Sequence, residues 1–94
     1  MANVLVTSAS AGFDEKQDVL VTATAGEPGS GISIHLQSKV MRQYGTHIKE
    51  LIKNTVTEAG FEDIVLDVKD NGAWDYTLEA RVESALERGM NHAE

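Results

Sequence analysis

The sequence predicts a two-layer α+β domain, in which a mainly antiparallel sheet of four to five strands packs against one main helix and short flanking helices. Apolar and polar residues alternate over residues 18–24, 32–36 and 64–82, which is the period of half-buried strands. Residues 47–59 instead carry apolar residues at helical spacing. With 94 residues, the chain is expected to form one domain over residues 1–94.

Composition and charge exclude several classes of protein. Hydrophobic residues make up 41% of the chain, it has no cysteine, and its formal charge is −7. A core is therefore expected, whereas disulfides and thiolate chemistry are excluded, and the negative charge opposes binding to nucleic acid. No apolar run approaches the roughly 20 residues of a membrane span, and the first residues lack the basic start of a signal peptide. We expect a cytoplasmic protein that does not enter a membrane.

Along the first half of the chain, residues 4–7 are predicted to form a short strand before the strands at 18–24 and 32–36. Ser38 is expected to cap a short helix that ends at Gly45, and Thr46 is expected to cap the main helix. Gly60 is well placed to end that helix in a left-handed conformation. The inward face of the main helix is predicted to carry Ile48, Leu51, Ile52 and Val56.

Residues 64–82 are predicted to form a β-hairpin around a three-residue loop at 70–72. This register places Val68 opposite Trp74, keeps Trp74 and Tyr76 in the core, and requires a positive φ at Gly72. A short helix over 83–88 and a frayed end at 90–94 would follow.

A helix over residues 76–88 is the alternative for the same segment, with Asp75 as its cap. Its inward residues would be Leu78, Val82, Ala85 and Leu86.

No set of residues indicates catalysis or metal binding. His35, His47 and His92 lack the spacing of metal ligands. Asp67 and Asp75 would face each other across the predicted hairpin, and paired carboxylates can act in acid–base catalysis. Both are expected to be solvated, so we predict a protein that is not an enzyme by itself.

Three segments resemble a known family. The sequence D-N-G-A-W-D at 70–75, followed by A-R-V at 80–82, resembles the D-K-G-A-L-D…A-R signature of the citrate lyase gamma subunit. That subunit is the acyl carrier protein of the lyase and is related to the malonate decarboxylase acyl carrier subunit. Residues 38–45 resemble the family's S-x-V-x-x-Q-F-G segment, and Ala11-Gly12 with Asp18-Val19 resemble its A-G-T-L-E-S-x-D-V segment. The resemblance covers about residues 9–89.

The resemblance implies a non-catalytic gamma subunit that presents a prosthetic arm within a citrate lyase-type complex. The arm of this family is 2'-(5''-triphosphoribosyl)-3'-dephospho-CoA, carried on a serine and loaded by an arm-transfer enzyme. The implied partners are an alpha-type acyl transferase subunit and a beta-type lyase subunit. A tether of this kind holds the acyl group at high effective concentration for both active sites.

The chain departs from the family at the attachment serine, because Lys16 occupies that position. Lysine has no hydroxyl for a phosphodiester, so we expect Lys16 to remain unmodified. Ser10 and Ser8 are alternative acceptors nearby in the sequence. A second hypothesis is therefore a structural or regulatory subunit that kept the fold and lost the arm, and a third is a free-standing small-molecule binding domain.

Overall fold

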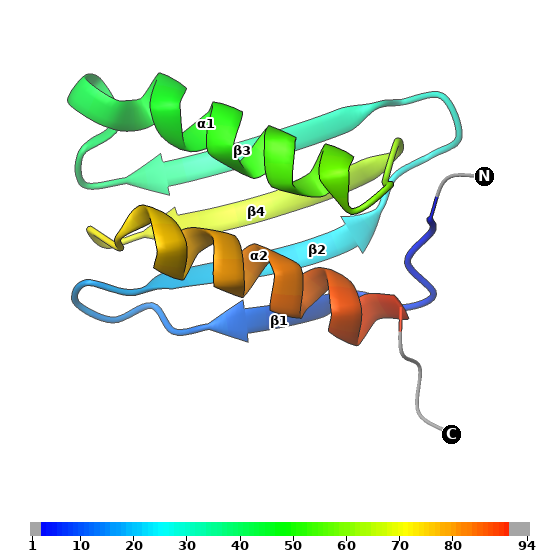
Figure 1. The fold of residues 1–94 in the computed structure, drawn as a ribbon, viewed down its shortest axis with the longest axis horizontal. Coiled ribbons are helices and arrows are strands. Elements are labelled where there is room, and N and C mark those ends of the chain that lie inside the picture. The colour runs from blue at the N-terminus through cyan, green and yellow to red at the C-terminus, as the bar shows by residue number, and fades with distance from the viewer. Residues whose placement is uncertain (1–2, 91–94) are drawn as a thin grey trace.

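The computed structural model describes residues 3–90 of the chain. The elements follow in the order β1 (Ala9–Gly12), β2 (Val19–Ala25), β3 (Ile32–Ser38), α1 (Met41–Glu58), β4 (Ile64–Asp70) and α2 (Asp75–Met90). One four-stranded sheet has the strand order β1-β2-β4-β3, and both helices cover the same face of it (Figure 1). The predicted two-layer α+β class is confirmed. The second layer holds two long helices rather than one main helix with short ones.

The sheet is mixed, because β2 runs antiparallel to β1 and β4 whereas β3 runs parallel to β4. Parallel neighbours need a crossover between them, and α1 provides it. Three apolar residues of α1, Ile48, Ile52 and Val56, are buried against the sheet as their spacing predicts. The other helix, α2, packs over β1 and β2 and also contacts α1. The core therefore lies in a single layer between the sheet and the helices.

The break predicted at Gly45 is wrong, because α1 runs without interruption from Met41 to Glu58 and buries Gly45. Val40 is the N-cap residue and no side chain caps the helix, so neither Ser38 nor Thr46 has the predicted role. A buried glycine costs a helix about 1 kcal/mol relative to alanine. Packing of the long apolar stripe offsets that cost. Gly60 has a φ of 87°, as predicted for the residue that ends the helix.

The predicted hairpin at 64–82 is wrong, and the helical alternative is confirmed. The strand β4 ends at Asp70 and α2 begins at Asp75. A further strand has no place beside β4, because β2 and β3 occupy both of its edges along its whole length. Gly72 does have the predicted positive φ, 89°, but in a turn that leads into a helix.

In α2, four buried apolar side chains have the spacing that the alternative predicted, namely Leu78, Val82, Ala85 and Leu86. Asp75 is the first residue of the helix rather than its cap, since the Leu78 N–H donates to the Trp74 carbonyl. Trp74 is 65% exposed and Tyr76 is 71% exposed, which corrects their predicted place in the core. The segment 83–88 belongs to this same helix, as does Met90, and 91–94 lie outside the described residues.

The strand predicted at residues 4–7 is also wrong. The N–H groups of Val6 and Thr7 donate to the Gly89 carbonyl at the end of α2 rather than to the sheet. Leu5 is buried against the same end, where it lies so close to Gly89 that a Cβ there would be 2.5 Å from the Leu5 Cδ2. The first strand is instead Ala9–Gly12, whose small residues give no periodic signal. None of the helices described over residues 3–90 combines the length and apolar character needed to cross a membrane.

Gly12 should be intolerant of any side chain. It has a φ of 90°, and a Cβ there would lie 1.9 Å from the Val19 carbonyl oxygen. We expect Gly12→Ala to lower the free energy of unfolding by more than the roughly 1–3 kcal/mol of backbone strain alone. Urea denaturation would measure the loss. Gly29→Ala is the matched control, because Gly29 has a similar φ of 84° and nothing within 4 Å of its Cβ position. Equal losses in the two variants would contradict a steric role for Gly12.

Ile52 and Leu51 should differ sharply when truncated, although both were predicted to face inward. Ile52 is fully buried, whereas Leu51 is only half-buried at the margin of the core. We expect Ile52→Ala to cost about 2–5 kcal/mol of unfolding free energy, as truncations of buried residues do. Leu51→Ala should cost clearly less. Urea denaturation of both variants would show which truncation costs more unfolding free energy. A larger loss for Leu51→Ala would contradict the assignment of the buried face of α1.

Candidate functional site

Three connections meet at one end of the molecule, which we call the loop end (left in Figure 1). They are the β1–β2 loop at 13–18, the β3–α1 connection at 39–40 and the β4–α2 turn at 71–74. All three segments of the family resemblance lie in or beside these connections. Residues far apart in the sequence therefore come together in one place.

Asp70 joins two of these connections. Its carboxylate is buried and accepts hydrogen bonds from the Ser38 Oγ at 2.8 Å and from the Ala73 N–H at 2.9 Å. The Ser38 Oγ in turn accepts from the Val40 N–H at 3.1 Å. A buried carboxylate is costly unless it is hydrogen-bonded, so these contacts fix both connections to the end of β4.

Arg81 of α2 holds both ends of the β1–β2 loop. Its guanidinium donates to the two carboxylate oxygens of Asp18, with Nη2 2.9 Å from Oδ2, and its Cζ lies 5.8 Å from the centre of the Phe13 ring. The Arg81 guanidinium, aided by a hydrogen bond from the Val19 N–H, holds the pKa of the Asp18 carboxyl below its ordinary value. The Asp-Val and Ala-Arg segments of the resemblance are thus joined by a bidentate ion pair.

Asn71 connects the same loop to the β4–α2 turn. Its side-chain Nδ2 donates to the Asp14 carboxylate at 2.7 Å, and its carbonyl accepts from the Gln17 N–H at 2.8 Å. Gln17 has a φ of 62°, a left-handed conformation that is uncommon for a residue with a side chain. The loop is therefore tied to its neighbours around Lys16, while the Lys16 side chain itself is exposed.

The predicted site residues occupy two different places. Lys16 lies in the β1–β2 loop at the loop end, whereas Ser10 lies within β1 opposite Thr22. Ser8 precedes β1, and its Oγ is 3.5 Å from the Thr24 Oγ1. Because Ala11 is buried, its neighbour Ser10 faces the side of the sheet that the helices leave open. The two serine hydroxyls thus belong to β1 and its start rather than to the loop.

The histidines and carboxylates do not form the arrangement considered from the sequence. The Nε2 of His47 lies 2.8 Å from the Asp75 Oδ2, and this exposed pair links α1 to α2. His35 and Asp67 are neighbours on exposed positions of β3 and β4, so Asp67 and Asp75 do not face each other as the hairpin predicted. Over residues 3–90, no group of three or more His, Asp or Glu side chains could hold a metal ion. His92 lies outside the described residues.

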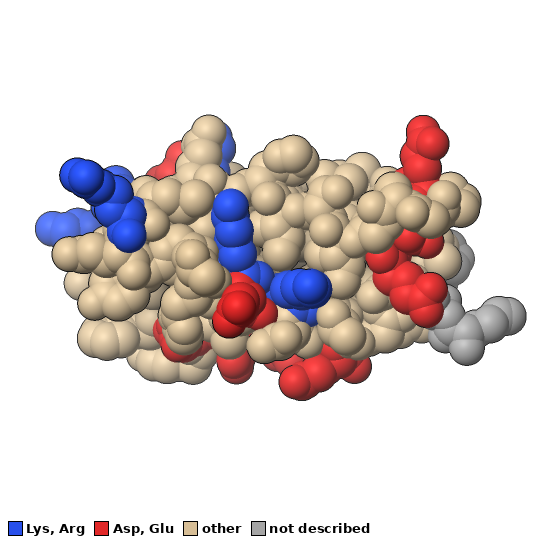
Figure 2. Space-filling model, turned by 90° about the horizontal axis from the view of Figure 1, so that it is seen from above, with Lys and Arg blue, Asp and Glu red and all other residues tan. Residues whose placement is uncertain are grey.

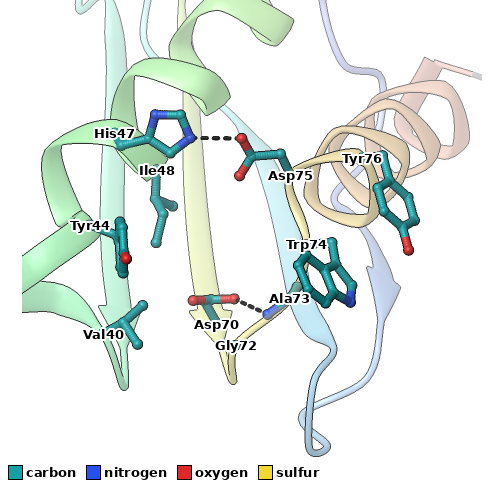
Figure 3. A pocket seen from close by; sticks show the side chains of 10 residues that line it. All are labelled: Val40, Tyr44, His47, Ile48, Asp70, Gly72, Ala73, Trp74, Asp75 and Tyr76. Atoms are coloured by element: carbon teal, nitrogen blue, oxygen red, sulfur yellow. Dashed lines mark hydrogen bonds and ion pairs between the residues drawn. The ribbon is translucent and has the colours of Figure 1, made fainter.

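A groove of about 570 Å³ opens between the starts of α1 and α2. In Figure 3, Tyr44 and Ile48 of α1 and the preceding Val40 form one side, and Ala73 and Trp74 form the other. The remaining residues that line the groove are His47, Asp70, Gly72, Asp75 and Tyr76. The walls are mainly apolar, and both carboxylates are engaged in the hydrogen bonds described above. The groove is therefore suited to an apolar group.

The sequence interpretation missed the groove and the Asp18–Arg81 pair. The predicted hairpin buried Trp74 and Tyr76 in the core. The surface site that these two exposed residues help to form therefore could not be recognised from the sequence. Asp18 and Arg81 lie 63 positions apart, so only the folded chain shows their contact. The one sequence feature that could have drawn attention to Asp18 and Arg81 is that each lies in a segment of the family resemblance.

The Asp18–Arg81 pair should stabilise the fold in a pH-dependent manner. Because the pKa of Asp18 is lowered in the folded state, its contribution is present above the unfolded value of about 3.8 and is lost as the pH falls through the lower folded value. We expect Asp18→Asn to reduce the unfolding free energy at pH 7 and to have a smaller effect at about pH 3, below the unfolded value. Urea denaturation across this range would measure it. Asp67→Asn, at an exposed position of β4, is the control. An equal effect of Asp18→Asn at both pH values would contradict the assignment.

Comparison with known proteins places the chain in a family. Residues 6–89 match the family model described as malonate decarboxylase delta subunit. The citrate lyase acyl carrier protein of Halothermothrix orenii is 39% identical over 87 residues, which cover 93% of this chain and 90% of that protein. The citrate lyase acyl carrier protein of Fusobacterium nucleatum is 40% identical and covers 90% of this chain and 89% of its own length.

A solved structure supports the same fold. The crystal structure of a Pseudomonas malonate decarboxylase hetero-tetramer in complex with malonate contains a chain that matches with a TM-score of 0.74. The match covers 92% of this chain and 87% of that one, at 20% sequence identity. Sequence and fold agree: the chain belongs to the acyl carrier family that contains the citrate lyase acyl carrier proteins and the malonate decarboxylase delta subunit.

Proposed function

We propose that this chain is the acyl carrier subunit of a citrate lyase-type complex and presents its loop end to the catalytic subunits. The observation that carries the proposal is the relationship over nearly the full length to citrate lyase acyl carrier proteins. The structure is consistent with it, because the three segments of the resemblance converge on one end, where hydrogen bonds connect them. The proposed partners are alpha-type acyl transferase and beta-type lyase subunits and an arm-transfer enzyme.

A carrier of this kind needs no catalytic group of its own. Over residues 3–90, the buried carboxylate of Asp70 and the ion pair of Asp18 are both engaged in holding connections together. A tethered acyl group reaches two active sites through its high effective concentration. We therefore infer a non-catalytic subunit that provides position and docking while its partners provide the chemistry.

The family's arm, a dephospho-coenzyme A derivative, does not fit position 16. The arm is joined through a phosphodiester and requires a hydroxyl, but residues 13–18 are Phe, Asp, Glu, Lys, Gln and Asp. Lysine could form only a more labile phosphoramidate, and an enzyme that positions a serine oxygen would hold the longer, charged side chain badly. We infer that the native chain does not receive the arm at Lys16. A phosphodiester would have to form at another hydroxyl, for which Ser10 and Ser8 are the candidates.

Intact mass spectrometry after co-expression with a citrate lyase arm-transfer enzyme tests these inferences. We expect Lys16→Ser to gain the mass of the arm at position 16, because contacts of Asn71 and Arg81 already hold the loop. Lys16→Ala is the matched control, since it removes the lysine without supplying a hydroxyl.

The same mass measurement on the native chain tests whether it acts as a carrier. A gain of the arm's mass that disappears in Ser8→Ala with Ser10→Ala would support carrier function with a displaced acceptor. A native chain that stays bare would contradict carrier function and favour the structural or regulatory subunit. Attachment to native Lys16 would overturn the chemical argument.

A further inference from the structure

Five of the eight large apolar side chains exposed over residues 3–90 lie at the loop end. They come from the β1–β2 loop, the start of α1 and the β4–α2 region: Phe13, Met41, Tyr44, Trp74 and Tyr76. Trp74 is 65% exposed and Tyr44 is 53% exposed. Exposed apolar patches mark interaction surfaces, and Trp and Tyr are the residues that most often dominate binding energy.

The groove gives these aromatic residues a defined shape. Tyr44 and Trp74 stand on opposite sides of it, and the His47–Asp75 pair spans from α1 to α2 (Figure 3). Asp75 is paired with His47 and Asp70 is hydrogen-bonded to Ser38, so both carboxylates beside the groove keep polar partners when an apolar group displaces water from it. The volume of about 570 Å³ is sufficient for a large aliphatic or aromatic side chain of a partner.

Basic residues lie beside the groove although the chain is acidic overall. Lys39 and Arg42 flank the groove residue Val40, are exposed, and form no ion pair within residues 3–90. Figure 2 shows basic side chains over the end where α1 begins and across the middle of this face, with some acidic side chains among them and others gathered over the opposite end. The formal charge of −7 is therefore unevenly distributed, and the surface next to the groove complements acidic groups.

We propose that the groove is the docking site of a protein partner that inserts an apolar side chain between Tyr44 and Trp74 and places carboxylates opposite Lys39 and Arg42. This inference rests on the proposed function, because it takes the partner to be a catalytic subunit of the lyase-type complex. The β4–α2 turn lines the groove and also holds the β1–β2 loop through Asn71. Docking in the groove thereby places that loop beside the partner.

Affinity measurements with purified citrate lyase alpha and beta subunits test the apolar part of the site. We expect Trp74→Ala and Tyr44→Ala each to weaken binding to one of these subunits by about 30-fold, as loss of an interface hot spot does. Val6→Ala is the control, because Val6 is 60% exposed and contacts the far end of α2. Both aromatic residues are exposed, so thermal unfolding of the variants should match the unchanged chain.

Association kinetics test the charged part of the site. We expect Lys39→Glu combined with Arg42→Glu to slow association and to reduce its dependence on salt, because rim charges act mainly on the rate of encounter. Lys53→Glu, at an exposed position further along α1, is the control for one reversed charge. If each reversed charge slowed association equally at Lys53 and at the Lys39–Arg42 pair, the proposed role of Lys39 and Arg42 would be overturned.

The outcomes separate this inference from the proposed function. If the unchanged chain binds a subunit and the groove variants bind equally well, the groove is not the docking site and the proposed function stands. If the unchanged chain binds neither subunit, both fail. Trp74 is the single tryptophan of the chain, so its fluorescence also reports on the groove. A response to dephospho-coenzyme A alone, with subunit binding unaffected by Trp74→Ala, would assign the groove to a small ligand instead.

Discussion

The buried carboxylate of Asp70 is the interaction on which the loop end depends. It lies at the last position of the central strand β4 and accepts hydrogen bonds from Ser38 and from the backbone of Ala73. Without these donors, a carboxylate in this position would be strongly unfavourable. The start of α1 and the start of α2 are consequently fixed relative to each other, and the groove between them has defined walls.

Arg81 extends this order to the β1–β2 loop. A single side chain of α2 forms an ion pair with Asp18 and lies over the ring of Phe13, so it contacts both ends of the loop. Gly12 lies so close to the Val19 carbonyl that no side chain fits where β1 and β2 adjoin this loop. These contacts give the β1–β2 loop a defined orientation at the loop end.

The fold of the β1–β2 loop does not depend on the side chain of Lys16. The contacts that hold the loop involve Asp14, Gln17 and Asp18, and none of them requires a particular side chain at position 16. The family fold can therefore persist whether or not residue 16 bears a hydroxyl. This independence is compatible with family membership of a chain that has a lysine at position 16, where the resemblance places the attachment serine.

The sequence by itself determined the fold class, the strands β2, β3 and β4 and the inward face of α1, because each has its own hydrophobic period. The segments of the resemblance contain Asp70, Arg81 and Asp18, but they do not indicate which contacts these residues make. Local patterning could not distinguish a strand from a helix after Gly72, since Leu78 and Val82 suit both periods. Only the tertiary structure decided this, because β2 and β3 already fill both edges of β4. The same packing exposed Trp74 and created the groove, since a helix that buries Leu78 and Val82 leaves the residues at its start in solvent.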